Sequence, residues 1–328
     1  MPRMPVYRKE NFMQIMQQLL GTYKNGNYQV ILLEDGTKIR VNNVEPQPGQ
    51  SPEDCFIAEF PESMDVCITH KCNMGCSMCY AGCTPDGRNA DIMNAKWIDS
   101  LHPWTECAIG GGNIFEHPDL IPFLEKLRNQ NVIANITLNQ QHFIEHINDV
   151  MKLSSQGLIR GVGVSVFNPT EQLINYMKAV SNTVAHCIVG VVDESVLKPL
   201  MYEDIRLLLL GYKTTGRGVG YSHQHYIEID KKTAALEDML PELFKTFRVV
   251  SFDNLALQQL HLKDHLTEEQ WNRFYMGDDG IEGKLTSATM YVDMPTNSFA
   301  LNSMNPVRFR IKDDDTVDTM FNYLRENL

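Results

Sequence analysis

Short apolar runs alternate with longer segments of mixed polarity through the middle of the chain. In two of the longer segments, residues 120–129 and 171–179, the apolar positions recur at the spacing of one helical face. Strands that alternate with helices build parallel βα units, so this pattern predicts an α/β fold with a parallel sheet. The predicted strands are residues 64–69, 106–109, 132–138, 161–167, 183–192 and 205–210.

The first sixty residues follow a different pattern. A helix is predicted over residues 1–20, where apolar side chains share one face before a glycine. Residues 28–33 and 38–41 are rich in apolar side chains and flank the turn-forming pair Asp35-Gly36, which predicts a β-hairpin. The apolar residues of the predicted helix are Phe12, Ile15, Met16, Leu19 and Leu20.

Composition and charge narrow the class of protein. Apolar residues make up 43% of the chain and charged residues 21%, as in ordinary folded globular proteins. Lys and Arg total 29 against 41 Asp and Glu, and the resulting net charge of −12 disfavours binding to a nucleic-acid backbone. No apolar run approaches the ~18 residues that a membrane span requires, and the first residues lack the apolar core of a signal peptide. We therefore expect a cytoplasmic protein.

Five of the eight cysteines lie between residues 67 and 83, and none follows Cys187. A disulfide scaffold would spread its cysteines over a shorter chain, so this crowding indicates metal or redox chemistry at one place. Cys72, Cys76 and Cys79 form a C-x3-C-x2-C run on the loop after the first predicted strand. Three thiolates on one loop can bind three irons of a [4Fe–4S] cluster and leave the fourth iron open.

A zinc site or a closed cluster is the alternative. Structural zinc usually takes four protein ligands, often as two separated pairs, and no second C-x2-C pair occurs downstream. Cys83 and His70 are the residues that could complete such a site. Cys83 could instead donate a hydrogen atom, carry a radical or be an ordinary free thiol.

The C-x3-C-x2-C motif on the loop after a first strand resembles the signature of the radical S-adenosylmethionine (radical SAM) superfamily. The resemblance implies a partial (β/α)6 barrel of TIM type, in which functional residues lie at the carboxyl ends of the strands. It also implies a [4Fe–4S] cluster on Cys72, Cys76 and Cys79, with SAM on the open iron. In this superfamily, reductive cleavage of SAM gives methionine and a 5′-deoxyadenosyl radical, which removes a hydrogen atom from the substrate.

The predicted parts of the chain follow from this fold. Residues 61–248 form the barrel, and residues 249–328 form a C-terminal extension that packs on it, with further apolar runs at 249–260 and 288–294. Residues 1–60, the N-terminal helix and hairpin element, cap the bottom of the barrel or bind part of the substrate. An edge strand of the hairpin could dock a peptide.

The resemblance assigns SAM to the residues after the second strand. Gly110, Gly111, Gly112 and Asn113 occupy the place of the Gly-Gly-Glu segment that binds the amino group of SAM. Glycine lets the backbone approach a ligand, and Asn113 or a backbone carbonyl can accept the hydrogen bond where Glu is common. A plain turn is the alternative. Met78 stands where an aromatic residue usually precedes the third cysteine, and it can still pack near the adenine.

Residues after later strands extend the predicted site. Ser165 and Asn168 end the fourth strand and could bind ribose hydroxyls or the SAM carboxylate, or face solvent. Lys213 and Arg217 form a cationic loop after the sixth strand, suited to the SAM carboxylate or an acidic substrate group, with a solvated loop as the alternative. The third strand carries alternating polar residues with the same two interpretations, Asn135, Thr137 and Asn139.

Two further polar sites are open. His223 and His225 alternate on a predicted strand, where they would share a face and could bind metal or shuttle protons, unless they are ordinary exposed histidines. Asp253 ends an apolar run and could touch the substrate.

The sequence thus predicts a radical SAM enzyme that acts on a small-molecule or peptide substrate and takes electrons from a reductant such as flavodoxin or ferredoxin. The absence of cysteine after Cys187 argues against auxiliary clusters in a C-terminal domain. The alternatives are a non-catalytic iron–sulfur or zinc protein and a cluster-dependent methyl or aminocarboxypropyl transferase. Products separate them, because the transferases release methylthioadenosine or S-adenosylhomocysteine.

Overall fold

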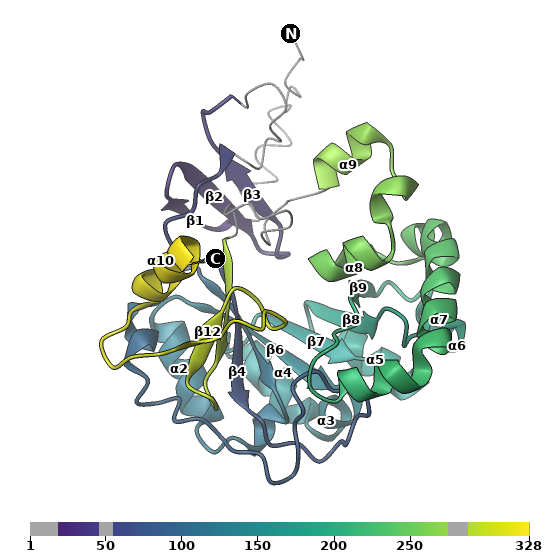
Figure 1. The fold of residues 1–328 in the computed structure, drawn as a ribbon, viewed down its shortest axis with the longest axis horizontal. Helices are drawn as coiled ribbons and strands as arrows, with labels where there is room; N and C mark the ends of the chain where they lie inside the picture. The colour runs from purple at the N-terminus through teal and green to yellow at the C-terminus, as the bar shows by residue number, and fades with distance from the viewer. Residues whose placement is uncertain (1–18, 46–54, 275–287, 328) are drawn as a thin grey trace.

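The structure is a computed structural model that describes residues 19–45, 55–274 and 288–327. Its main element is a ten-stranded sheet in the order β10-β9-β8-β7-β6-β5-β4-β11-β12-β13. All neighbours from β10 to β11 are parallel, and β12 and β13 continue the sheet in antiparallel pairing. Figure 1 shows this sheet with its helices around it. The predicted α/β fold with a partial barrel is confirmed.

The six predicted strands are all present as adjacent parallel strands. The long predicted strand at residues 183–192 stops at Ile188, because the chain turns at Gly190 with a φ of +74°. The strands are β4 (Ser63–Thr69), β5 (Glu106–Gly111), β6 (Ile133–Asn139), β7 (Gly161–Ser165), β8 (Thr183–Ile188) and β9 (Arg206–Leu210).

Helices connect these strands and cover the outer face of the sheet. The predicted helix at residues 171–179 is present as α5, which begins where Thr170 accepts a hydrogen bond from Leu173 N at 3.2 Å. The helices are α2 (Leu120–Asn129), α3 (Gln140–Glu145), α4 (Ile147–Ser155), α5 (Glu171–Ala179), α6 (Glu194–Leu197) and α7 (Gly218–Thr246), and the 3-10 turns are η2 (Lys96–Ser100), η3 (Ile114–Glu116) and η4 (Lys198–Leu200).

Alternate residues of each strand face opposite sides of the sheet. Val66, Ile109, Ile136, Val164 and Leu207 are buried and pack against the helices. The residues between them face the inside of the barrel, which we call the lumen.

The N-terminal element is a three-stranded antiparallel sheet. The predicted hairpin is present as β2 (Tyr28–Leu33) and β3 (Lys38–Val41), and β1 (Leu19–Asn25) pairs with β2. The prediction of a helix through residue 20 is wrong at its end, because Leu19 and Leu20 belong to β1 and take up pairing with β2 that their spacing could not reveal. The rest of that predicted helix lies outside the described residues.

This small sheet contacts the large one where the parallel strands begin (Figure 1). Glu62, just before β4, is 1% exposed and forms ion pairs with Arg40 at 2.9 Å and with Lys38 at 3.2 Å. Lys38 also pairs with Glu106 at the start of β5, at 2.8 Å, and the hydroxyl of Tyr28 hydrogen-bonds to Glu62. Buried charges persist only when they are paired in this way.

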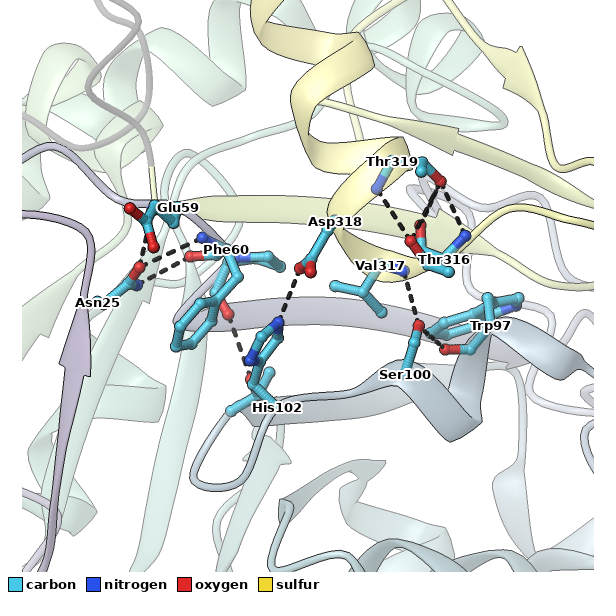
Figure 2. A network of polar contacts seen from close by, with 12 residues as sticks. Asn25, Glu59, Phe60, Trp97, Ser100, His102, Thr316, Val317, Asp318 and Thr319 are labelled. Atoms are coloured by element: carbon cyan, nitrogen blue, oxygen red, sulfur yellow. Dashed lines mark hydrogen bonds and ion pairs between the residues drawn. The ribbon is translucent and has the colours of Figure 1, made fainter.

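A polar network joins the C-terminal helix α10 (Val317–Asn327) to the same end of the barrel (Figure 2). His102 stacks on Phe60 with ring centroids 3.8 Å apart, and its Nε2 lies 2.8 Å from a carboxylate oxygen of Asp318. The hydroxyl of Ser100 accepts a hydrogen bond from Val317 N at 2.8 Å, which satisfies a donor at the helix start.

Residues beyond α7 add strands to both sides of the predicted barrel. The strands are β10 (Val249–Phe252), β11 (Thr289–Asp293), β12 (Ser298–Ala300) and β13 (Phe309–Arg310), and the remaining helical segments are α8 (Asn254–Gln259), η5 (Leu262–His265) and α9 (Glu268–Phe274). Asp253 caps α8 by accepting from Ala256 N at 2.7 Å and also accepts from Gly211 N at 2.8 Å. These bonds give Asp253 a structural role.

His223 and His225 lie on helix α7, so the prediction of a strand there is wrong. Residues two positions apart on a helix point in different directions, so His223 and His225 do not share a face as they would on a strand. His225 itself breaks the helix, with φ −122° and ψ 19°, and stacks on Tyr221 with centroids 4.3 Å apart. Among the described residues, no helix has the length and apolar character to cross a bilayer.

Candidate active site

The loop that carries Cys72, Cys76 and Cys79 leaves β4 at the carboxyl end of the sheet. All three cysteines are free thiols and half-buried. Cys72 N donates to Thr84 O at 2.9 Å, and Cys79 N donates to Cys76 O at 3.2 Å. Backbone hydrogen bonds therefore fix this loop, which we call the cysteine loop (residues 70–84).

The spread of the three sulfur atoms indicates the size of the group they could hold. A single zinc ion with about 2.3 Å bonds would bring its sulfur ligands to about 3.8 Å of one another. Within the described ranges, only Cys67, His70 and Asp293 bring three such ligand atoms within 4.8 Å of one another. The three cysteine-loop sulfurs do not all lie within 4.8 Å of one another, which favours a polynuclear cluster over a single ion.

Burial and hydrogen bonds shift the pKa values of the thiols in the cysteine loop. Burial raises the pKa of Cys72 and of Cys76. The Cys83 thiol hydrogen-bonds to Cys79 and, with the nearby Arg217, lowers the pKa of Cys79, whereas the same bond raises the pKa of Cys83. Cys79 is thus prepared to act as a thiolate, the form that binds iron.

Arg217 fastens the cysteine loop to the loop after β9. Its Nε donates to Cys76 O at 2.8 Å, and its Nη1 donates to Cys83 O at 2.8 Å. Its backbone N donates to Cys79 O at 3.0 Å. A Cβ on neighbouring Gly216 would lie 2.4 Å from Tyr80 O, so only glycine allows this close approach. The structure therefore gives Arg217 a role in holding the loop that the sequence did not indicate.

Two other side chains, His142 and Asn139, contact the cysteine loop. The buried His142 lies with Nε2 3.0 Å from the Asn73 side-chain oxygen. Asn139 directs its Nδ2 at Cys76 Sγ, 4.0 Å away, and its oxygen caps α3 by accepting from Gln141 N at 3.0 Å. Hydrogen bonds to cluster sulfurs tune the reduction potential of iron–sulfur sites.

The glycine segment at the end of β5 lies against the same loop. Gly111 has a φ of +112°, and a Cβ there would lie 2.2 Å from Thr69 O. A Cβ on Gly112 would lie 2.1 Å from Lys71 O, whereas Gly110 has only Thr137 nearby, at 3.9 Å. Gly111 and Gly112 thus serve loop packing, and Gly110 leaves open space toward the lumen.

The side chain of Asn113 forms hydrogen bonds with residues that follow it directly in the chain. Its side-chain oxygen accepts from Phe115 N at 3.2 Å and caps η3, and its amide contacts Glu116 at 3.5 Å. The residue is 5% exposed. Backbone carbonyls of the glycine segment are therefore the better placed acceptors for a ligand amino group.

The other predicted SAM ligands, Ser165, Asn168 and Met78, lie in three different parts of the barrel. Ser165 faces the lumen from β7, in register with Asn139 on one side and His186 on the other. Asn168 is exposed on the following loop. Its backbone N donates to Gln140 Oε1 at 2.9 Å, and its backbone O accepts from Gln140 Nε2 at 3.0 Å. Met78 lies in the cysteine loop, and Gly218 approaches its carbonyl.

Lys213 reaches into the lumen from the loop after β9. Its Nζ donates to the Ser303 hydroxyl at 2.8 Å and lies 4.5 Å from the centre of the Tyr80 ring. Tyr80 follows the last cluster cysteine, so Lys213 places a positive charge beside the candidate cluster site.

Asp65 and His186 are lumen residues that the sequence analysis missed. Burial, together with the charge of Lys213, lowers the pKa of His186 to about 4, and its Nδ1 is buried with no hydrogen-bond partner among the described residues. Burial raises the pKa of Asp65 although Lys213 opposes it, and Asp65 lines a cavity of about 240 Å³ with Ala108 and Asn135. Asp65 and Thr69 are polar residues on the same face of β4, and this pattern could have indicated that the face lines the lumen.

Comparisons with known proteins agree with this fold. No protein-family model matches the chain. A stretch of 120 residues, 34% of the chain, is 28% identical to the antilisterial bacteriocin subtilosin biosynthesis protein AlbA of Bacillus subtilis (strain 168), and it spans about a quarter of that protein's length (26%). SuiB of Streptococcus suis bound to S-adenosylmethionine superposes with a TM-score of 0.59 at 11% identity, covering 94% of this chain and 88% of SuiB.

The chain has the fold of SuiB over most of its length. The structure of SuiB bound to its precursor peptide SuiA superposes equally well, with a TM-score of 0.59 at 10% identity over 95% of this chain and 89% of SuiB. At this identity the likeness establishes the fold. The cysteine loop and the glycine segment lie at the carboxyl ends of β4 and β5, where parallel barrels carry their functional residues.

Proposed function

We propose that this chain is a radical SAM enzyme that modifies a peptide. Cys72, Cys76 and Cys79 would hold a [4Fe–4S] cluster, and the glycine segment would hold SAM. When bound and reduced, this pair of cofactors supplies a 5′-deoxyadenosyl radical that abstracts hydrogen from a substrate. The chain's own task is to bind, orient and enclose these groups.

The observation that carries the proposal is the construction of the cysteine loop. Three half-buried thiols lie on one loop and do not all lie within 4.8 Å of one another, and Cys79 is favoured as a thiolate. Arg217 fixes the backbone at both Cys76 and Cys83 without offering a fourth ligand. Such a loop suits a cluster that keeps one iron open.

The lumen supplies contacts for the rest of SAM and for the substrate. Gly110 leaves room at the end of β5, and the glycine carbonyls can accept hydrogen bonds from the SAM amino group. We assign Ser165, Asn168 and Lys213 to the ribose and carboxylate of SAM, with Met78 packing at the adenine. Lys213 suits an anionic group because its ammonium already lies in the lumen beside Tyr80.

A peptide is favoured over a small molecule as substrate. The relative in Bacillus subtilis is a bacteriocin biosynthesis protein, and SuiB was solved with a precursor peptide. Within the described residues, β3 pairs with β2 on one side only, so its other edge could accept a peptide strand. Reductive cleavage of SAM consumes one electron, so the proposal includes a reductant such as flavodoxin or ferredoxin.

The test is formation of 5′-deoxyadenosine. The protein is purified without oxygen, reconstituted with iron and sulfide, reduced and mixed with SAM, and the product is measured by mass spectrometry. Cys76→Ala should lose production, whereas Cys187→Ala, a buried free cysteine on β8, should retain it. Release of methylthioadenosine or S-adenosylhomocysteine would favour the transferase. Zinc in place of a cluster would contradict the proposal.

A further inference from the structure

A second set of metal-ligand side chains lies beside the cysteine loop. Cys67 Sγ, a ring nitrogen of His70 and a carboxylate oxygen of Asp293 all lie within 4.8 Å of one another. No other group of three such side chains in the described part of the chain meets this distance. None of the three belongs to the C-x3-C-x2-C motif.

The three residues are brought together by regular structure. Cys67 on β4 and Asp293 on β11 are register partners in a parallel pair, so the sheet itself sets their separation. His70 follows β4 directly, and its Nε2 lies 3.2 Å from Asp293 Oδ1. Thr296 N donates to Asp293 Oδ1 at 3.2 Å and holds the carboxylate at the end of β11. A site whose ligands are fixed before binding loses little entropy when an ion enters.

Burial and neighbouring groups support ligand binding at this point. Cys67 is 3% exposed, and the side chains of His70 and Asp293 are 22% and 15% exposed. A Cβ on Gly111 would lie 2.7 Å from Cys67 Sγ, so glycine keeps the space beside the sulfur open. The Tyr291 hydroxyl donates to Asp293 Oδ2 at 3.4 Å, a contact of the kind that orients metal-ligating carboxylates.

The donor chemistry identifies the class of ion. One thiol, one imidazole and one carboxylate form a mixed S, N and O set, which suits zinc rather than calcium or magnesium. An ion pair between His70 and Asp293 would need no cysteine beside it, but a zinc ion would use all three groups.

We propose that Cys67, His70 and Asp293 bind one zinc-type divalent ion, separate from the cluster, with a fourth position for water. The ion joins β11 to the residue two places before Cys72, and so it stabilises the entry to the cysteine loop. His70, a possible zinc ligand alongside Cys83 on sequence grounds, is thereby assigned to a different set of partners. This site does not depend on the proposed enzyme activity.

The experiment uses the full chain with Cys72, Cys76 and Cys79 replaced by Ser, so that no cluster can form. After removal of metal by a chelator, the protein is titrated with Co²⁺ alone. The expected result is one equivalent bound, with a thiolate-to-cobalt charge-transfer band from Cys67. Adding Cys67→Ser should abolish the band, and adding Asp293→Asn should keep the band but weaken binding by about tenfold or more.

Cys187→Ser in the same background is the matched control and should bind cobalt as before. Circular dichroism of each variant checks that it is folded, and Asp293→Asn, which keeps the side-chain shape, answers the question if Cys67→Ser does not fold. Absence of stoichiometric binding, or binding unchanged by both Cys67→Ser and Asp293→Asn, would overturn the proposal. Because this protein carries no cluster, either result leaves the test of 5′-deoxyadenosine formation independent.

Discussion

The two ends of the parallel strands are built on different principles. Where the strands begin, Glu62 is buried but fully paired with Lys38, Arg40 and Tyr28. Where the strands end, Lys213 reaches past Tyr80 into the lumen, and His186 keeps a buried nitrogen with no partner among the described residues. Glu62 is therefore satisfied within the protein, whereas the buried nitrogen of His186 is left for another group to satisfy.

The two ends also differ in the segments that they join. At the amino ends, the network of Figure 2 connects His102, Ser100 and α10 through direct hydrogen bonds. At the carboxyl ends, Gly111 and Gly216 adopt positive φ values so that three loops can meet around the cysteines. Positive φ values occur at both ends, for example at Trp104 and Asn131 before β5 and β6, so the ends differ in the groups that they gather rather than in strain. The comparison therefore separates an end that joins the terminal elements to the barrel from an end that gathers the cysteines.

The largest expected effect is on stability at the amino end. Glu62→Ala leaves Arg40 and Lys38 without their shared buried partner and should lower the free energy of unfolding by about 3–5 kcal/mol. Urea denaturation measures this change. The exposed pair Lys178–Glu203 is the control, since Glu203→Ala should cost at most about 1 kcal/mol. Equal losses in the two variants would show that the burial of Glu62 does not strengthen its ion pairs.

The next prediction concerns pH and the lumen. Unfolded His186 titrates near its ordinary pKa of 6.5, whereas in the folded protein burial and Lys213 lower its pKa to about 4. Between these two pH values the unfolded state binds a proton that the folded state does not bind. The free energy of unfolding therefore falls by about 3 kcal/mol as the pH drops from 6.5 to 4. His186→Gln should lose less stability than the wild-type protein between pH 7 and pH 4.5, and identical losses would contradict this account.

Replacing Gly111 tests whether the strained backbone supports the site. Gly111→Ala places a Cβ 2.2 Å from Thr69 O at a φ of +112°, whereas Gly157→Ala shares a positive φ but has nothing within 4 Å. We expect Gly111→Ala to cost about 1–3 kcal/mol more stability than Gly157→Ala and to weaken SAM binding, as measured by thermal denaturation and by titration of the reconstituted protein. A similar cost at both positions would show that the close approach to Thr69 is unimportant.

The smallest expected effect compares one substitution at the two ends. Arg217→Lys keeps the charge but loses the planar guanidinium whose Nε and Nη1 donate to Cys76 O and Cys83 O, so the reconstituted cluster should be lost to a chelator about tenfold faster, a difference of about 1.4 kcal/mol. Arg206→Lys, at the start of β9 where Arg206 donates to Asn182 at 2.7 Å, should leave that rate unchanged. A faster loss in both variants would indicate a general destabilisation instead.

Local patterns predicted much of the fold because they depend on neighbouring residues. The spacing of Leu120, Phe123, Leu124 and Leu127 predicts α2 from a single apolar face, and the structure has the helix at the predicted bounds. Leu19 and Leu20 were assigned wrongly to a helix because their place in β1 depends on pairing with β2, and His225 was assigned wrongly to a strand although it lies in α7. A strand needs a partner to pair with, and its own pattern does not show whether one exists.

In the candidate site, too, local patterns were predictable from the sequence and contacts between distant residues were not. The spacing of Cys72, Cys76 and Cys79 indicated a cluster, because all three ligands lie on one loop. The contacts of Arg217 with that loop, and the meeting of Lys213 with Ser303, join residues that are about ninety or more positions apart. The meeting of Cys67 with Asp293 depends on β11 pairing with β4, which no local pattern reveals.

The central claim is that the cysteine loop holds a [4Fe–4S] cluster with one iron open to SAM. Electron paramagnetic resonance of the reduced, reconstituted protein tests it most directly, with spectra recorded before and after addition of SAM. The account predicts a cluster signal that changes shape when SAM is added, and no cluster signal in Cys76→Ala. A cluster signal that SAM leaves unchanged, or a protein that takes up zinc and no iron at these cysteines, would contradict it.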